Sequence, residues 1–264
     1  MSIILFPILI NLLVSLLTAP IGCILIWKRI SYFADYLAHS LMLAVALSIL
    51  IDINLNYLLI IFSILISLII ISLKNQTYFK FDLIINVISP FFLALSLIIL
   101  HFYPNNIDLS SYLFGDLLAV NNNDIITISM LTLVVYCWLF FNWNKLLLIV
   151  IDENIAASNG LNIHKFRLIY LTIISFTIAM IIKLVGILMI TAILILPSAI
   201  ARIITKNPFS MCVASYIINV TIATIAIIIS YYSDLAITPI TIVLLSCILF
   251  ASLIAQKVKQ IFHP

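Results

Sequence analysis

The sequence predicts an all-α protein that crosses a membrane about eight or nine times. Hydrophobic residues make up 66% of the 264 residues, whereas charged residues make up only 8%. A soluble domain carries about 25% charged residues, so this chain has too few to cover a water-facing surface. The apolar residues also form long runs, and a run of about 20 such residues can span a bilayer as a helix. We therefore expect a single transmembrane domain over residues 1–264.

Polar breaks divide the chain into nine apolar segments. In chain order the expected spans are Ile3–Ile26, Ser31–Ile51, Tyr57–Leu73, Leu83–Tyr103, Ile125–Phe141, Leu168–Ile182, Leu184–Ile200, Met211–Tyr232 and Leu235–Ala255. The first segment is too long for a signal-peptide core and no basic residues precede it, so we interpret it as a span. The two segments beside Lys183 are shorter than an ideal span, and a broken or re-entrant segment there would leave about eight full spans.

Basic residues indicate which span ends face the cytoplasm. Short loops rich in Lys and Arg stay on the cytoplasmic side of a membrane. The basic residues follow the odd-numbered spans, at Lys28, Arg29, Lys74, Lys80, Lys145, Lys165, Arg167, Arg202, Lys206, Lys257 and Lys259. This pattern predicts an outer N-terminus and a cytoplasmic C-terminus, and it places Lys183 at an outer turn. The basic residues lie at the expected span ends and form no stripe that would bind nucleic acid, so membrane lipid is an expected partner and nucleic acid is not.

Two ionisable residues, Asp35 and His39, lie in the segment that opens the second span. Without this segment the span would be too short, so both residues are predicted to lie inside the membrane. Residues four apart share one helix face, and an ionisable group inside a bilayer usually faces a cavity or a partner. Carboxylate and imidazole are suitable ligands for a divalent metal such as zinc. Spacing equally allows an Asp35–His39 hydrogen bond that only stabilises the helix bundle.

The largest predicted cytoplasmic loop, Asn142–Arg167, contains a candidate short helix. Asp152 is a suitable N-cap and Gly160 a suitable C′ residue of a short helix. An ordinary surface helix would explain the same pattern. The residues expected to couple such a helix to an ATPase are Asp152, Glu153, Ala156, Ala157 and Gly160. The chain has no P-loop and no nucleophile elbow, so we expect a transport subunit that is not itself an enzyme.

The semi-apolar segment Pro104–Val120 is predicted to lie on the outer side. It is consistent with a short interfacial or gating helix, and equally with a capping loop. Its acidic residues, Asp108 and Asp116, could attract cations weakly or could simply be solvated.

Several motifs together resemble one transporter family. Trp27-Lys-Arg-Ile-Ser-Tyr-Phe-Ala-Asp-Tyr-Leu-Ala-His39 resembles the signature of metal-type ABC permeases, the manganese, zinc and iron class. Tyr112–Val120, Lys183–Gly186 and Leu194–Arg202 are similar to stretches typical of zinc-uptake permeases. These matches follow the family order over nearly the whole chain. Ala34 departs from the pattern, because the family usually has Gly before the Asp.

The resemblance implies the permease subunit of an ABC importer in the bacterial inner membrane. It implies zinc as the transported substrate, with manganese or iron as alternatives, and no permanently bound cofactor. It also implies a second permease copy, a dimer of ATP-binding subunits and a periplasmic metal-binding protein. Asp35 and His39 match the family motif, which implies a transient metal site.

Two readings from other classes remain open at this point. A secondary metal transporter driven by an ion gradient would use Asp35 as a proton relay and would need no ATPase. An intramembrane enzyme would bind a catalytic metal at Asp35 and His39 and would turn over as the isolated chain. The loop Asn142–Arg167 favours the ABC importer.

Overall fold

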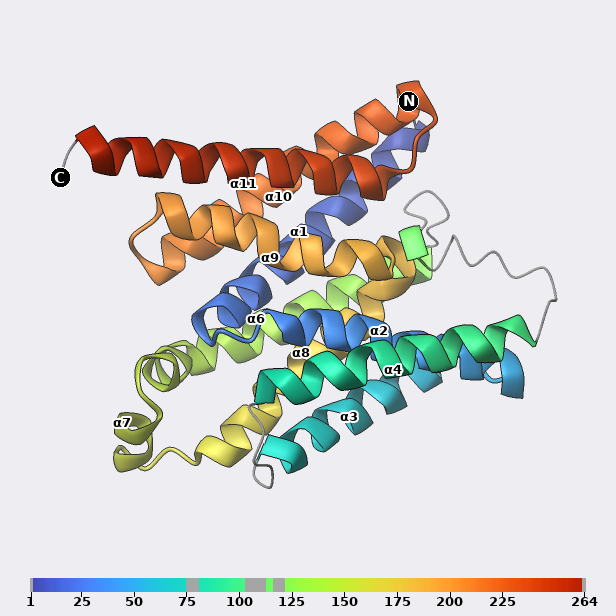
Figure 1. The fold of residues 1–264 in the computed structure, drawn as a ribbon, viewed down its shortest axis with the longest axis horizontal. Helices are drawn as coiled ribbons and strands as arrows, with labels where there is room; N and C mark the ends of the chain where they lie inside the picture. Colours follow the sequence, from blue (N-terminus) through green and yellow to red (C-terminus); the bar gives the residue numbers. More distant parts are fainter. Residues whose placement is uncertain (1, 75–80, 103–112, 116–121, 263–264) are drawn as a thin grey trace. The chain divides into compact units, whose positions relative to one another are not determined.

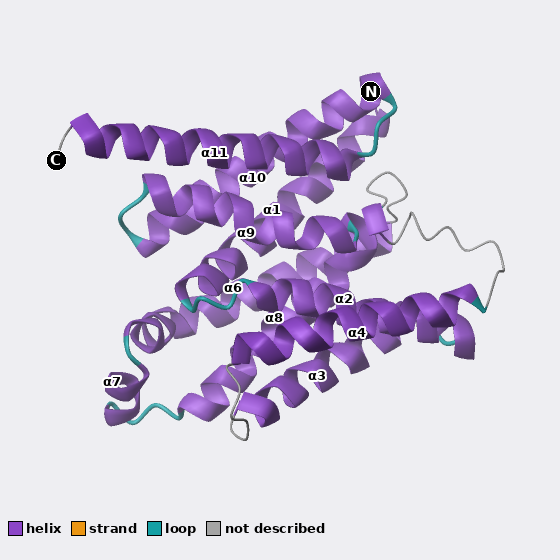
Figure 2. Ribbon diagram, viewed as in Figure 1, coloured by secondary structure: helices purple, strands orange, loops and turns teal. Residues whose placement is uncertain are grey.

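The structure is a computed structural model that describes residues 2–74, 81–102, 113–115 and 122–262. Within these ranges all regular secondary structure is helical (Figure 2). The helices are α1 (Ser2–Trp27), α2 (Tyr32–Ile51), α3 (Leu55–Lys74), α4 (Phe81–His101), α6 (Asn122–Ile151), α7 (Glu153–Ser158), α8 (Ile163–Val185), α9 (Ile187–Ile204), α10 (Pro208–Ser233) and α11 (Ile237–Phe262).

Each of the nine predicted spans lies largely within a different long helix (Figure 1). In the described ranges, seven helices are long and apolar enough to cross a membrane, namely α1, α2, α6, α8, α9, α10 and α11. The stretches Leu55–Ile69 of α3 and Asn86–His101 of α4 are shorter apolar helices. The helices beside Lys183 and Gly186, α8 with 23 residues and α9 with 18, are both among the seven candidate spans. The polytopic all-α fold is confirmed.

The stretch Asn142–Arg167, predicted as a cytoplasmic loop that contains a short helix, is mostly helical. Helix α6 continues to Ile151 and α8 already begins at Ile163, so only the short helix α7 and its two connections lie between them. The polar residues after Phe141 suggested a span end. They do not interrupt the backbone hydrogen bonds of a helix, and an apolar run from Leu146 to Ile151 follows them.

The chain forms two compact units. We call the described part of residues 1–31, 108–128 and 182–264 the terminal unit. The described part of residues 32–107 and 129–181 is the central unit. The expectation of a single domain over residues 1–264 stays a prediction.

In the terminal unit α1 packs against α9 and α10, and α11 packs against the same two helices. Gly22 brings α1 close to α9, since a Cβ atom at this position would lie 1.9 Å from the carbonyl oxygen of Leu194. Small residues allow such close backbone approach between membrane helices. Buried polar groups also join α1 to α10, because Asn219 donates to the hydroxyl of Thr18 at 3.1 Å.

In the central unit α2 packs against α3 and α4. The ring centroids of Tyr36 on α2 and Phe92 on α4 lie 6.4 Å apart, and Tyr36 is 1% exposed. Ser67 on α3 and Ser175 on α8 form a buried hydrogen bond of 2.8 Å. Thirteen residues of α2 are buried, among them Ala34, which has no exposed surface. This packing holds the helix that carries Asp35 and His39.

At the predicted outer end of the terminal unit, two glycines with left-handed backbone meet. Gly115 has φ of +73° and Gly186 has φ of +81°. A Cβ atom at Gly186 would lie 2.4 Å from the backbone nitrogen of Gly115. Thr238 of α11 donates a hydrogen bond to the carbonyl oxygen of Phe114, which holds the same short segment. Residues 112 and 116–120 of the motif, and Asp108, lie outside the described residues.

Candidate functional site

Asp35 and His39 lie on one side of α2, as their spacing predicted. Asp35 Oδ2 is 3.7 Å from His39 Nδ1, beyond hydrogen-bond distance. The Asp35 side chain is 48% exposed and the His39 side chain 21% exposed, whereas the intervening Tyr36, Leu37 and Ala38 are buried. The two polar groups thus share the open side of a helix that is otherwise packed.

The structure adds a third polar group, Ser89 of α4, that sequence reasoning missed. Ser89 Oγ lies 2.8 Å from His39 Nδ1, and the serine is 4% exposed. In the sequence Ser89 is one of several serines within apolar runs, and nothing distinguishes it from the others. Only the packing of α4 on α2 brings it to the imidazole. The contact occupies Nδ1 and leaves Nε2 as the ring nitrogen that faces away from Ser89.

The His/Cys/Asp/Glu side chains of one copy supply only a pair of candidate metal ligands here. No group of three or more such residues that could hold a metal occurs in the described part of the chain. Asp35 supplies a carboxylate and His39 an imidazole. A four-coordinate ion would therefore need further ligands from outside this set.

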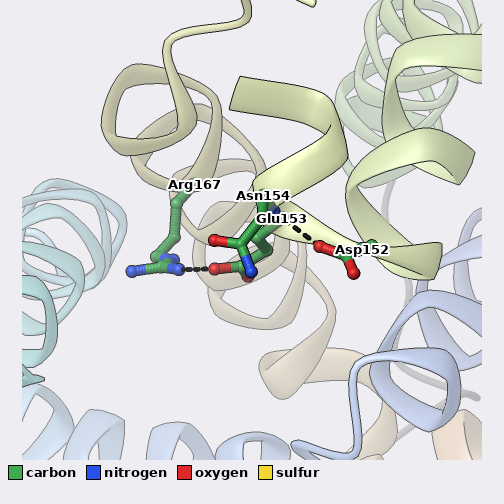
Figure 3. A network of polar contacts seen from close by, with 4 residues as sticks. All are labelled: Asp152, Glu153, Asn154 and Arg167. Atoms are coloured by element: carbon green, nitrogen blue, oxygen red, sulfur yellow. Dashed lines mark hydrogen bonds and ion pairs between the residues drawn. The ribbon is translucent and has the colours of Figure 1, made fainter. Parts of the chain in front are cut away.

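The short helix α7 has the two caps that the sequence predicted, and Figure 3 shows the first of them, at Asp152. Asp152 Oδ1 accepts hydrogen bonds from the backbone N–H groups of Asn154 at 2.6 Å and Ile155 at 3.3 Å. At the other end Gly160 has φ of +78° and donates to Ala157 O at 2.9 Å, while Leu161 donates to Ala156 O at 3.2 Å. This pair of bonds is the Schellman ending of a helix, and it explains why glycine suits position 160.

An ion pair joins α7 to the first turn of α8. The Arg167 guanidinium donates to Glu153 Oε2 at 2.5 Å, and the Arg167 side chain is only 11% exposed (Figure 3). Phe166 beside it packs on Trp138 of α6, with ring centroids 5.5 Å apart. These contacts fix α7 relative to the two long helices that flank it.

The predicted coupling residues fall into two groups by exposure. Ala156 is fully buried, and Asp152 and Glu153 are half-buried and occupied by the cap and the ion pair. Ala157 and Gly160 are exposed. Sequence reasoning missed Ile155, which is 49% exposed and gives α7 an apolar contact residue. An isoleucine at the surface of a short predicted cytoplasmic helix was a signal that could have been used.

Comparison with known proteins decides the family. A sequence profile of the ABC 3 transport family matches residues 1–256. The chain belongs to this family. This ABC 3 family chain is therefore a multi-pass transport protein of a membrane, in agreement with its apolar helices.

Named relatives span nearly the full length of the chain. The high-affinity zinc uptake system membrane protein ZnuB of Haemophilus influenzae is 34% identical over 249 residues, which are 94% of this chain and 95% of the relative. ZnuB of Buchnera aphidicola subsp. Acyrthosiphon pisum is 34% identical over 254 residues, covering 96% of each chain. The manganese import system permease protein ScaB of Streptococcus parasanguinis is 31% identical over 258 residues, which are 95% of this chain and 90% of the relative.

Solved structures share the fold of this ABC 3 family chain. PsaBC from Streptococcus pneumoniae in complex with Fab superposes with a TM-score of 0.84 at 23% identity, covering 96% of this chain and 91% of the other. An inward-facing putative metal-chelate type ABC transporter superposes with a TM-score of 0.76 at 18% identity, covering 95% and 85%.

Proposed function

We propose that the chain is the permease subunit of an ABC importer that carries Zn²⁺ across the inner membrane into the cytoplasm. The main support is that Asp35 and His39 lie together on the open side of α2. The chain that carries them is 34% identical to zinc uptake membrane proteins over almost all of its length. A periplasmic metal-binding protein would deliver the ion, and a dimer of ATP-binding subunits would drive its passage. Zn²⁺ is the transported substrate, and the proposal includes no resident cofactor.

Asp35 and His39 supply the transient metal site in this proposal. Two copies of the chain with their α2 helices facing one pore would offer two carboxylates and two imidazoles, which suits a tetrahedral ion. The Ser89 contact supports the imidazole role, since a metal-binding His usually holds its other ring nitrogen in a hydrogen bond. In the tautomer that this proposal requires, Nδ1–H donates to Ser89 Oγ and the Nε2 lone pair is the metal ligand. Two ligands per chain without a thiolate keep the site weak enough for release.

Manganese is the alternative substrate, and the 31% identity to a manganese import permease favours it. Nitrogen and oxygen ligands can also hold Mn²⁺. A site of given N/O ligands binds Zn²⁺ more tightly than Mn²⁺ in the general affinity order of divalent metals, so zinc is the first expectation.

Radioactive metal uptake tests both substrate and site. The chain, its ATP-binding subunit and its binding protein are expressed together in cells that lack their own zinc importer. We expect saturable ⁶⁵Zn²⁺ uptake that excess Mn²⁺ or Fe²⁺ inhibits only weakly. Asp35→Ala and His39→Ala should each reduce uptake to the level of cells without the permease, while membrane insertion and recovery of the ATP-binding subunit stay normal.

Two control variants test whether the loss of uptake is specific to the proposed metal site or follows the removal of any Asp or His side chain. Asp52→Asn and His101→Ala change an exposed Asp and an exposed His at predicted outer helix ends, and they should leave uptake unchanged. Normal uptake by both Asp35→Ala and His39→Ala would show that the pair is structural. Uptake that persists with a hydrolysis-deficient ATP-binding subunit would instead support the ion-gradient transporter.

The helix α7 forms the contact to the ATP-binding subunit in this proposal. Ile155 and Ala157 supply its exposed contact surface, and Asp152, Glu153, Ala156 and Gly160 hold that surface in place through the cap, the ion pair, packing and the helix ending. Ala157→Glu should weaken copurification of the ATP-binding subunit or uncouple ATP hydrolysis from uptake. The control is Lys259→Gln, which changes an exposed residue near the end of α11 and also lowers the net charge by one. Equal copurification and coupling in both variants would remove α7 from the interface.

A further inference from the structure

Two adjoining cavities in the terminal unit share Arg202 as a common wall. The first, of about 330 Å³, is lined among others by Trp27, Arg202, Lys206 and Asn207, where α1 and α9 end and α10 begins. The second, of about 420 Å³, runs between α9 and α11 and is lined among others by Ile195, Ala199, Ile203, Leu249 and Leu253. One cavity is thus polar and basic, and its neighbour is chiefly apolar.

The basic cavity has unused positive charge. Arg202 and Lys206 lie four residues apart near the end of α9, and both are exposed. Neither forms an ion pair with a carboxylate in the described part of the chain, and no acidic residue lines either cavity there. Trp27 adds an indole ring to the wall. Tryptophan is typical of the headgroup level of a membrane, where its ring is half in apolar surroundings.

The apolar cavity continues from the basic one along helices that span the membrane. Ile195, Ala199 and Ile203 follow one another at intervals of four residues on α9, and Leu249 and Leu253 do the same on α11. Eight residues of helix correspond to about 12 Å along the axis. Both helices are long and apolar enough to cross a bilayer. The groove therefore runs from the headgroup level into the hydrocarbon region, and Arg202 marks its cytoplasmic end under the predicted orientation.

We propose that these two cavities bind one anionic phospholipid of the cytoplasmic leaflet. The phosphate and headgroup occupy the basic cavity between Arg202 and Lys206, and one acyl chain lies in the groove between α9 and α11. Charge complementarity selects an anionic headgroup, because cytoplasmic-leaflet anions are attracted to unpaired Lys and Arg at that level. A free phosphate would leave the apolar groove unfilled, so the joined pair of cavities fits a lipid.

Native mass spectrometry of the purified full chain in detergent tests the proposal, with phosphatidylglycerol and phosphatidylcholine of the same acyl chains as probes. We expect one tightly held phosphatidylglycerol and a clear preference over phosphatidylcholine. The Arg202→Gln/Lys206→Gln double variant should bind phosphatidylglycerol about 30-fold more weakly, because each basic group near an anionic surface accounts for about a fivefold effect. Arg202→Lys should retain most of the preference.

Two further variants separate the groove from surface charge. Lys257→Gln/Lys259→Gln removes two exposed charges that line neither cavity, and the tightly held lipid should remain. Ala199→Phe fills the groove and should release phosphatidylglycerol while both cavity cations stay in place. Inorganic phosphate and glycerol phosphate at millimolar concentration should not displace the lipid.

Four results would overturn the proposal. The first is unchanged phosphatidylglycerol binding in the double variant, and the second is equal loss in the Lys257→Gln/Lys259→Gln control, which would indicate diffuse surface charge. The third is displacement by inorganic phosphate, which would leave only an anion site. A changed oligomeric state of Ala199→Phe with normal lipid binding would likewise contradict it and would assign the groove to a second copy of the chain.

Discussion

His39 Nδ1 of α2 and Ser89 Oγ of α4 lie 2.8 Å apart, although 50 residues separate them in the sequence. In the proposed metal site this contact sets the ring orientation of the imidazole. We expect Ser89→Ala to raise the zinc concentration for half-maximal uptake about 10- to 100-fold, because loss of a partner behind a metal ligand weakens binding by this much. Ser89→Thr should restore part of the effect, since it keeps a hydroxyl.

Ser96 on the same helix provides the control for Ser89. Its hydroxyl donates to the backbone oxygen of Leu93 on its own helix and is fully buried. Ser96→Ala should leave the uptake curve unchanged. If Ser89→Ala and Ser96→Ala gave the same curve, the Ser89 contact would not act on the metal site.

The contact between Gly115 and Gly186 predicts a specific loss of stability. Gly186→Ala forces a Cβ atom to within 2.4 Å of the Gly115 backbone nitrogen at φ of +81°. Backbone strain and overpacking together should lower the free energy of unfolding by about 2–4 kcal/mol. Gly160→Ala is a matched control, because Gly160 has a similar φ of +78° with nothing within 4 Å. Thermal unfolding in detergent should show the smaller loss, about 1 kcal/mol, for Gly160→Ala.

At Gly22 we expect substitution by alanine to destabilise the protein, which is the opposite of what helix propensity alone predicts. In a helix interior Gly→Ala normally stabilises by about 1 kcal/mol. At Gly22 the added methyl would lie 1.9 Å from Leu194 O and 2.5 Å from Ser198 Oγ, so Gly22→Ala should destabilise the protein. Ser198→Ala should not rescue it, because the backbone oxygen stays in place. A higher unfolding temperature for Gly22→Ala would contradict this packing of α1 on α9.

Lys183 and Asp124 form an ion pair of 3.2 Å, with 44% of the Lys183 side chain exposed. The lysine lies in the last turn of α8 and the aspartate in the first turn of α6, as expected for two residues on the same predicted outer face. Exposed pairs usually contribute about 0–1 kcal/mol, so Lys183→Gln should have little effect on stability. Metal uptake should remain near the normal rate. Loss of uptake with normal membrane insertion would assign Lys183 to the transport path.

Cysteine labelling tests the predicted orientation. In a background with all four native cysteines replaced, Lys259→Cys should react with an impermeant thiol reagent only after the membrane is opened. Tyr232→Cys, exposed near the end of α10, should react in intact cells whose periplasm is accessible. The opposite labelling pattern would reverse the topology and with it the placement of α7 and the lipid site.

Sequence alone predicted the long helices well because each is defined by its own residues. A bilayer requires long apolar runs whose backbone groups are all satisfied within the helix, so span positions follow from local composition. The caps of α7 were equally local, since Asp152 and Gly160 act on backbone groups a few residues away. Helices α6 and α8 extend past the predicted span ends at Phe141 and Leu168, because an end of apolarity is not an end of helical hydrogen bonding.

Only the tertiary structure decided which residues meet across helices. The sequence placed Asp35 and His39 on one helix face, but it could not show that Ser89 supports the imidazole or that Ala156 is buried while Ile155 is exposed. The contact of Gly115 with Gly186 was equally invisible. In these apolar helices the side chains are similarly hydrophobic on every face. The face that packs against another helix is therefore set by contacts between segments distant in the sequence. Such contacts depend on three-dimensional fit, which no short stretch of sequence contains.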